Sequence, residues 1–109
     1  RLEALLEAHA SEVAAVVMEP VLENIGIVVP DEGYLAGVRA LCDKHGVLLV
    51  FDEVKTGLTA GYAGASQRLG IQPDLVALAK SIGGGLPLAA FGGKRANLAP
   101  HLEALTNNR

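Results

Sequence analysis

The stretch "VLLVFDEVKTG", Val47 to Gly57, sets five apolar residues directly before two carboxylates. A short apolar run of this kind, bounded by polar residues, is typical of a strand buried on both faces of a sheet. The run "LVALA" at 75–79 follows it in the chain and ends on Lys80, and the run "VAAVVM" at 13–18 precedes it and ends at Glu19. The sequence therefore predicts three buried strands, each closed by an ionisable side chain.

Helical patterns separate these strands. Apolar residues recur at three-residue and four-residue steps before the first strand and between the first two, where Asp31 is expected to cap a helix that ends at Gly46. Helices are expected at about 2–9, 31–45, 63–69 and 94–105, with a fourth strand at 87–93. No helix fits between the third and fourth strands, so the fourth is either antiparallel or displaced. Strands that alternate with helices favour an α/β fold with a mostly parallel sheet flanked by helices.

Composition and charge exclude several classes of function. The chain has 109 residues, half of them hydrophobic, which is enough for one domain with a core. Its net charge of -3 and its lack of tryptophan leave no basic or aromatic surface for nucleic acid. The apolar runs are far shorter than the ~20 residues of a membrane helix. We therefore expect neither a nucleic-acid partner nor a membrane span.

Cys42 is the only cysteine, so no internal disulfide can form. It lies in a helical pattern, where a small buried hydrophobe is the expected role, and a reducing cytoplasm fits this usage. The sequence starts at Arg1, within the apolar pattern of the first helix, and has no signal peptide. We expect a cytoplasmic protein of which this chain is one piece.

The ionisable residues at the strand ends are the candidate site. Ligands of open α/β sheets bind beyond the carboxyl ends of parallel strands. If the second and third strands are neighbours, their ends lie roughly 5 Å apart, so Asp52 and Lys80 could hold opposite sides of one small ring. This pair matches what pyridoxal phosphate needs, because an amine forms an imine with its aldehyde and a carboxylate keeps its ring nitrogen protonated.

The same residues have simpler interpretations. Asp52 and Glu53 could cap a loop or a following helix, and Lys80 could be a solvated strand end. The glycines at 83–85 could form a tight turn, or an anion cradle in a nucleotide-binding module, although "GGGLP" matches neither the P-loop nor the dinucleotide fingerprint. No metal site is expected.

Three ordered motifs carry a resemblance to a known family. They are "EPVLENIGIVVP" at 19–30, "LLVFDEVKTG" at 48–57 and "PDLVALAKSIGGGLPLAAFGG" at 73–93. Together with their spacing they resemble the class III aminotransferases, and within them the branch of glutamate-1-semialdehyde 2,1-aminomutase. The resemblance implies the large domain of the aspartate aminotransferase type (fold type I), the cofactor pyridoxal 5'-phosphate, a small-molecule amino donor or acceptor, and a homodimer.

The resemblance also implies roles for individual residues. Lys80 would be the catalytic residue that forms the internal aldimine and shuttles protons, Asp52 would pair with the pyridine nitrogen, and Val54 would pack under the ring. Lys55 stands where many relatives have glutamine or methionine, so different contacts are expected near the ring. Lys55 is also a rival for the imine. Asn24 is expected to have a structural role in its loop.

Residues 1–109 would then be a fragment of the cofactor-binding large domain, without the phosphate-binding segments and the small domain. The parent protein is expected to be an aminotransferase or an aminomutase, the latter an isomerase. Two alternatives remain: a catalytically inactive truncated fragment or paralogue, and an anion-binding or nucleotide-binding α/β module.

Overall fold

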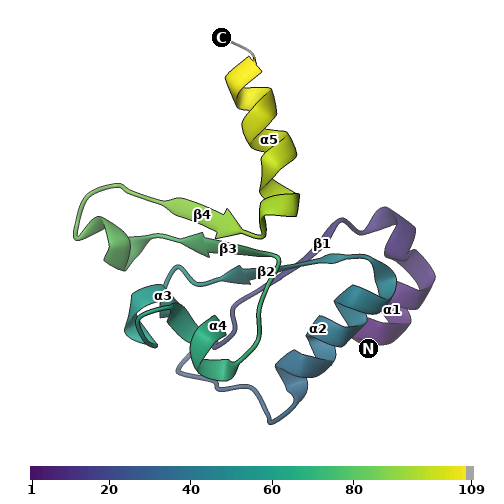
Figure 1. Ribbon diagram of the computed structural model, residues 1–109. Coiled ribbons are helices and arrows are strands. Elements are labelled where there is room, and N and C mark those ends of the chain that lie inside the picture. The colour runs from purple at the N-terminus through teal and green to yellow at the C-terminus, as the bar shows by residue number, and fades with distance from the viewer. Residues whose placement is uncertain (108–109) are drawn as a thin grey trace.

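The computed structural model describes residues 1–107, which form a four-stranded sheet with helices packed mainly on one side (Figure 1). The elements are α1 (Leu2–His9), η1 (Ala10–Glu12), β1 (Ala15–Met18), α2 (Tyr34–His45), β2 (Leu48–Asp52), α3 (Thr56–Thr59), α4 (Gly64–Leu69), β3 (Leu75–Leu78), η2 (Lys80–Gly83), β4 (Ala90–Gly93) and α5 (Arg95–Asn107). Every strand and helix that the sequence predicts is present. The α/β class is confirmed.

The sheet has the strand order β1-β2-β3-β4. The first three strands are parallel, with Met18 opposite Phe51 and Asp52 opposite Ala77, and β4 runs antiparallel to β3. Adjacent parallel strands place their carboxyl ends at one edge of a sheet, so the residues that follow β1, β2 and β3 lie along that edge. The mostly parallel sheet is confirmed, and the fourth strand takes the antiparallel option.

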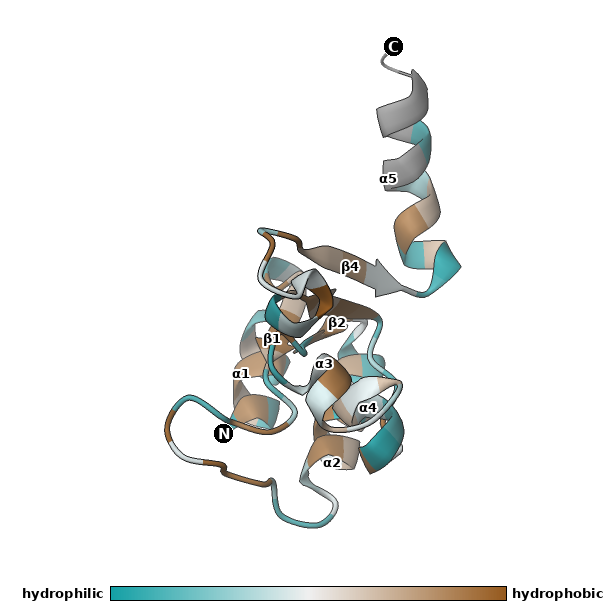
Figure 2. Cartoon of the chain, turned by 90° about the vertical axis from the view of Figure 1, so that its left-hand side faces the viewer, coloured by the Kyte–Doolittle hydropathy of each residue, from teal (hydrophilic) through white to brown (hydrophobic). Residues whose placement is uncertain are grey.

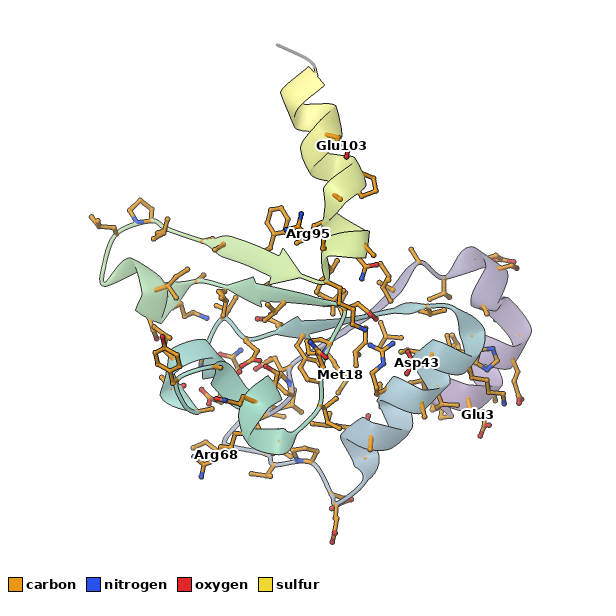
Figure 3. The ribbon with its side chains drawn as sticks, in the orientation of Figure 1. Glu3, Met18, Asp43, Arg68, Arg95 and Glu103 are labelled. Atoms are coloured by element: carbon orange, nitrogen blue, oxygen red, sulfur yellow. The ribbon has the colours of Figure 1, made fainter. Side chains whose placement is uncertain are left out.

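The core lies between α2 and the sheet. Phe51, Leu49 and Cys42 are fully buried there, and Met18 packs against them. Figure 2 shows hydrophobic residues on β2 and on one face of α2, and Figure 3 shows Met18 in the layer between sheet and helices. Cys42 is the small buried hydrophobe that its helical position predicted. Burial of each large side chain contributes about 1.5–3 kcal/mol, so this layer is what holds α2 to the sheet.

The expectation that the first strand is buried on both faces is wrong for this chain. Val17 is 68% exposed, whereas its neighbours Val16 and Met18 pack against the core. Side chains alternate between the two faces of a strand, and α2, α3 and α4 lie on one side of the sheet, while α5 leads away from the end of the edge strand β4 (Figure 1). The second face is therefore left largely uncovered by the described residues.

Two local predictions also fail. Asp31 does not cap a helix: its carbonyl accepts the N–H of Tyr34 in a turn, and Gly33, at φ 78°, occupies the cap position. The left-handed φ of Gly33 delays the helix by three residues relative to the prediction. The one-turn helix α3 follows Asp52, in a segment where none of the expected helices lies.

One buried carboxylate ties four elements together at the amino end of β3. Asp74 Oδ2 accepts hydrogen bonds from the N–H of Leu49 at 2.8 Å and from Arg39 Nη1 at 2.7 Å, while Oδ1 accepts one from Lys94 Nζ at 2.7 Å. Its backbone N–H donates to the carbonyl of Leu49, and its carbonyl accepts the N–H of Lys94. Asp74 thus joins α2, β2 and the end of β4 to β3.

The surroundings of Asp74 favour its charged form. Burial by itself raises the pKa of this carboxyl, but the hydrogen bonds from Leu49, Lys94 and Arg39 outweigh burial and lower the pKa from 3.8 to about 2. Because the folded-state pKa lies below the unfolded value, the charged group stabilises the fold fully above about pH 4, and this contribution is lost as the pH falls through about 2.

We predict that Asp74→Asn lowers the free energy of unfolding at pH 7 by about 2 kcal/mol, the equivalent of the pKa shift. Urea unfolding followed by circular dichroism measures the change. Between about pH 4 and pH 2 the wild type should lose stability faster than the variant. Asp43→Asn is the matched control, because Asp43 also bonds Arg39 at 2.7 Å but has a side chain that is 64% exposed on α2 (Figure 3). Loss of the Asp43 charge should lower the free energy of unfolding by less than about 1 kcal/mol. Equal losses in the two variants would contradict the prediction.

Candidate active site

Asp52 ends β2 and lines a cavity. One of its oxygens, Oδ1, accepts the N–H of Val54 at 3.0 Å, a turn typical of aspartate after a strand, and the other makes no hydrogen bond within the described residues. The cavity, about 690 Å³ in volume, lies between the end of β1, the loop at 19–31 and Tyr34 of α2. The half-buried carboxylate of Asp52 is therefore oriented by its own turn and keeps one oxygen available to a ligand.

Lys80 begins η2 in a strained backbone conformation. Its φ is 49°, and it is the one residue other than glycine with a positive φ between residues 1 and 107. A left-handed conformation costs a residue with a Cβ roughly 1–2 kcal/mol, and such strain gathers at functional sites. The side chain is exposed, and Lys80 comes three residues after Ala77, the partner of Asp52 in the sheet register. The structure thus brings Lys80 and Asp52 to the same edge of the sheet.

Val54 and Lys55 lie in the short connection between β2 and α3, and both are half-buried. The Lys55 carbonyl accepts the hydroxyl of Thr59 at 2.5 Å, and its φ of -100° is ordinary for a residue that precedes a helix. The two lysines therefore lie on different elements, neither of them lines the cavity beside Asp52, and of the two only Lys80 has a positive φ.

Glu53 takes the simpler role that the sequence left open for carboxylates after a strand. Its side chain is 2% exposed and accepts the backbone N–H groups of Ala65 at 2.6 Å and Ser66 at 3.0 Å, and the Thr56 hydroxyl at 3.1 Å. These groups open α4 and α3, so Glu53 holds both helices to the end of β2. Two of its partners are 12 and 13 residues away, and the third, Thr56, begins a helix that sequence reasoning missed, so no local pattern identified them.

The glycines form a turn rather than an anion cradle. Gly84 and Gly85 have φ values of 55° and 99°, which residues with a Cβ rarely adopt. The N–H of Gly84 donates to the Ser81 carbonyl, and the N–H of Leu86 donates to the Gly83 carbonyl. These bonds reverse the chain between η2 and β4, which is why a glycine run follows Lys80.

The loop at 19–30 is a small extended hairpin. Leu22 and Val28 exchange two backbone hydrogen bonds, and Glu19 Oε2 accepts the N–H of Glu23 at 3.3 Å. Asn24 is exposed in the turn of this loop. Its position is that of a turn residue, in keeping with the structural role expected for it.

The described residues offer neither a metal-binding cluster nor a membrane-spanning helix. Residues 1–107 hold no group of three or more His, Cys, Asp or Glu side chains arranged to bind a metal ion. None of their helices is both long enough and apolar enough to cross a membrane.

Comparison with known proteins connects this geometry to a family. The model of the family "Aminotransferase class-III" matches residues 1–103. Glutamate-1-semialdehyde 2,1-aminomutase of Roseiflexus castenholzii is 57% identical over 93 residues, which are 85% of this chain and 21% of that protein. The aminomutase of Nitratidesulfovibrio vulgaris strain DP4 is 54% identical over 91 residues, which are 84% of this chain and 22% of that protein.

Solved structures show the same arrangement. A glutamate-1-semialdehyde aminomutase from Pseudomonas aeruginosa superposes with a TM-score of 0.80 at 46% identity, over 87% of this chain and 20% of that one. A β-phenylalanine aminotransferase from Variovorax paradoxus superposes with a TM-score of 0.83 at 38% identity, over 90% and 23%. A variant of the Pseudomonas aminomutase was solved in complex with PMP.

These neighbours define the class: the α/β fold of this chain is that found in transaminases of fold type I. The chain belongs to the class III aminotransferase family. It spans about a fifth of the length of the relatives it matches.

The strain at Lys80 can be tested without cofactor. We predict that Lys80→Gly raises the free energy of unfolding by about 0.5–1 kcal/mol, because glycine adopts a positive φ without steric cost. Lys55→Gly is the matched control and should lower it by a similar amount, since Lys55 has an ordinary φ and glycine adds only flexibility to the unfolded chain. Urea titration of the cofactor-free protein measures both. Destabilisation by Lys80→Gly would show that Lys80 is not strained.

Proposed function

We propose that the protein containing this chain is a pyridoxal-phosphate-dependent enzyme that moves an amino group, either an aminotransferase or an aminomutase. The observation that carries the proposal is the register of β2 and β3, which brings Asp52 and Lys80 to one edge of the sheet in a chain of the class III family. The relatives matched over most of this chain are aminomutases and transaminases, one of them solved with PMP. The cofactor, when bound, supplies an aldehyde for the amine and a ring that accepts electrons from the substrate.

The roles follow from the surroundings of each residue. Asp52 would pair its carboxylate with the ring nitrogen and hold a proton there, since one of its oxygens has no partner in the described residues. Lys80 Nζ, exposed at the same edge, would bind the cofactor aldehyde and later remove and return the proton at the substrate carbon. Val54 would pack under the ring.

We propose a small-molecule amino donor or acceptor as the substrate, with an aminomutase, an isomerase, as the first choice of reaction. This choice is supported by the solved structures, among which the Pseudomonas aeruginosa aminomutase is 46% identical to this chain and the β-phenylalanine aminotransferase 38%. Both reactions use the same two residues for proton transfer and ring charge, so the choice depends on the relatives and not on the site.

We further propose that the chain is the central part of a large domain, and that other segments of a longer polypeptide supply the grip on the cofactor phosphate and the small domain. The proposal follows from the fifth of each relative's length that the chain covers. We also propose that the complete protein is a cytoplasmic homodimer, because this is what the resemblance to the family implies. Size-exclusion chromatography with light scattering of the complete protein tests the dimer.

Lys80→Ala should abolish the visible absorption band of the bound cofactor in the complete protein, because no amine then joins the aldehyde. Borohydride reduction followed by peptide mass analysis should label Lys80 alone in the wild type. Lys55→Ala, the matched control, should keep both the band and the label. A band that survives Lys80→Ala and disappears in Lys55→Ala would move the assignment to Lys55.

Asp52→Asn should lower turnover by roughly 10-fold to 1000-fold, the rate equivalent of the ~1–3 units by which an adjacent carboxylate shifts a pKa. The neutral amide cannot hold the proton on the ring nitrogen, although it keeps the turn with the N–H of Val54. Steady-state kinetics of the complete protein, with cofactor content measured for each variant, gives the ratio. A decrease below twofold at equal cofactor content would exclude this role.

A further inference from the structure

We propose that Glu53 is a positioning residue, which fixes Asp52 and the turn that carries Lys80 relative to each other. This inference rests on the proposed function. Glu53 is buried and follows Asp52 directly. Among the described residues its carboxylate makes no hydrogen bond to Asp52 or Lys80.

The first step is the fixation of Glu53 itself. Three donors converge on its carboxylate, and its backbone is held on both sides: its N–H donates to the Ala77 carbonyl of β3 at 3.0 Å, and its carbonyl accepts the N–H of Gly57 at 2.8 Å. A buried carboxylate that lost these partners would pay the cost of an unsatisfied charged group. The peptide that follows Asp52 is therefore immobilised, and with it the direction of the Asp52 side chain.

The second step is the space made for the carboxylate. Gly64 lies against it at φ 73°, and a Cβ at that position would overlap one carboxylate oxygen, Oε2, and crowd the other. The chain thus uses glycine where the backbone of α4 must approach a buried anion closely. This close approach brings the N–H groups of Ala65 and Ser66 within hydrogen-bond distance.

The third step reaches Lys80. Thr56, whose hydroxyl bonds Glu53, begins α3 and is 2% exposed. The next residue, Gly57, is packed so closely on Leu78 that a Cβ would overlap the leucine side chain, and α3 contacts η2. Leu78 ends β3 two residues before Lys80. A shift of α3 caused by the loss of the Glu53 bonds is therefore transmitted to the turn of Lys80.

The first arm of the test needs no cofactor. Glu53→Gln replaces one acceptor oxygen of the carboxylate by an amide N–H₂ group, which cannot accept the N–H donors that face it. The backbone amides at 80–84 report on the turn of Lys80, because the N–H groups of Ile82 and Gly84 are hydrogen-bonded there. Their hydrogen exchange should become about threefold faster or more. Glu12→Gln is the matched control, since Glu12 is exposed in η1, and it should leave this exchange unchanged. Unchanged exchange at 80–84 in folded Glu53→Gln would overturn the coupling to Lys80.

The second arm uses the complete, cofactor-loaded protein. In Glu53→Gln the pH midpoint of the visible cofactor band should shift, because a misdirected Asp52 no longer holds the proton on the ring nitrogen. Turnover should fall about 10-fold to 100-fold at saturating substrate, the expected cost of displacing a reacting group by about 1 Å. A purely structural role would lower the melting temperature and leave the band and turnover of the folded protein at wild-type values, which would overturn the proposal.

Thr56→Val keeps the test valid if Glu53→Gln does not fold. It removes one of the three donors and should produce a smaller change of the same kind in both arms, while Thr56→Ser, which keeps the hydroxyl, should behave as wild type. If the wild type showed no cofactor band at all, the proposed function would fail, and the exchange arm would still decide whether Glu53 holds the turn of Lys80.

Discussion

The structure depends on the buried carboxylate of Asp74 at the amino end of β3. It accepts hydrogen bonds from a strand N–H, a guanidinium and an ammonium group, so it fixes β2, α2 and the end of β4 at once. A slip of one residue in the register of β2 and β3 would turn every side chain of a strand to the other face. Asp74 opposes such a slip, because the slip would leave a buried charge without its partners.

A second buried carboxylate performs the same task at the opposite end of these strands. Glu53 binds only neutral donors, two backbone N–H groups and a hydroxyl, and thereby attaches α3 and α4 to the carboxyl edge of the sheet. Asp52 and Lys80 lie at this same edge, to which α3 and α4 are attached.

Much of the fold was predictable, because it follows from local patterns. Apolar runs closed by ionisable residues located β1, β2 and β3, and glycines after periodic segments ended α2 and α4 at Gly46 and Gly70. The start of α2 was not predictable, since Gly33 adopts a left-handed conformation that nothing in the sequence requires. The one-turn helix α3 was missed because its stability comes from Glu53 and from packing on Leu78, and not from its own four residues.

The sequence by itself determined the alternation of strands and helices, the candidates Asp52 and Lys80, and the turn at 83–85, because each depends on residues adjacent in the chain. Only the tertiary structure decided which carboxylates are buried and what they bind. Asp74 and Glu53 find most of their partners 12 to 35 residues away, on elements whose approach is set by packing. The strain at Lys80 likewise arises where the end of β3 meets α3 and the turn to β4, and no property of the lysine itself reveals it.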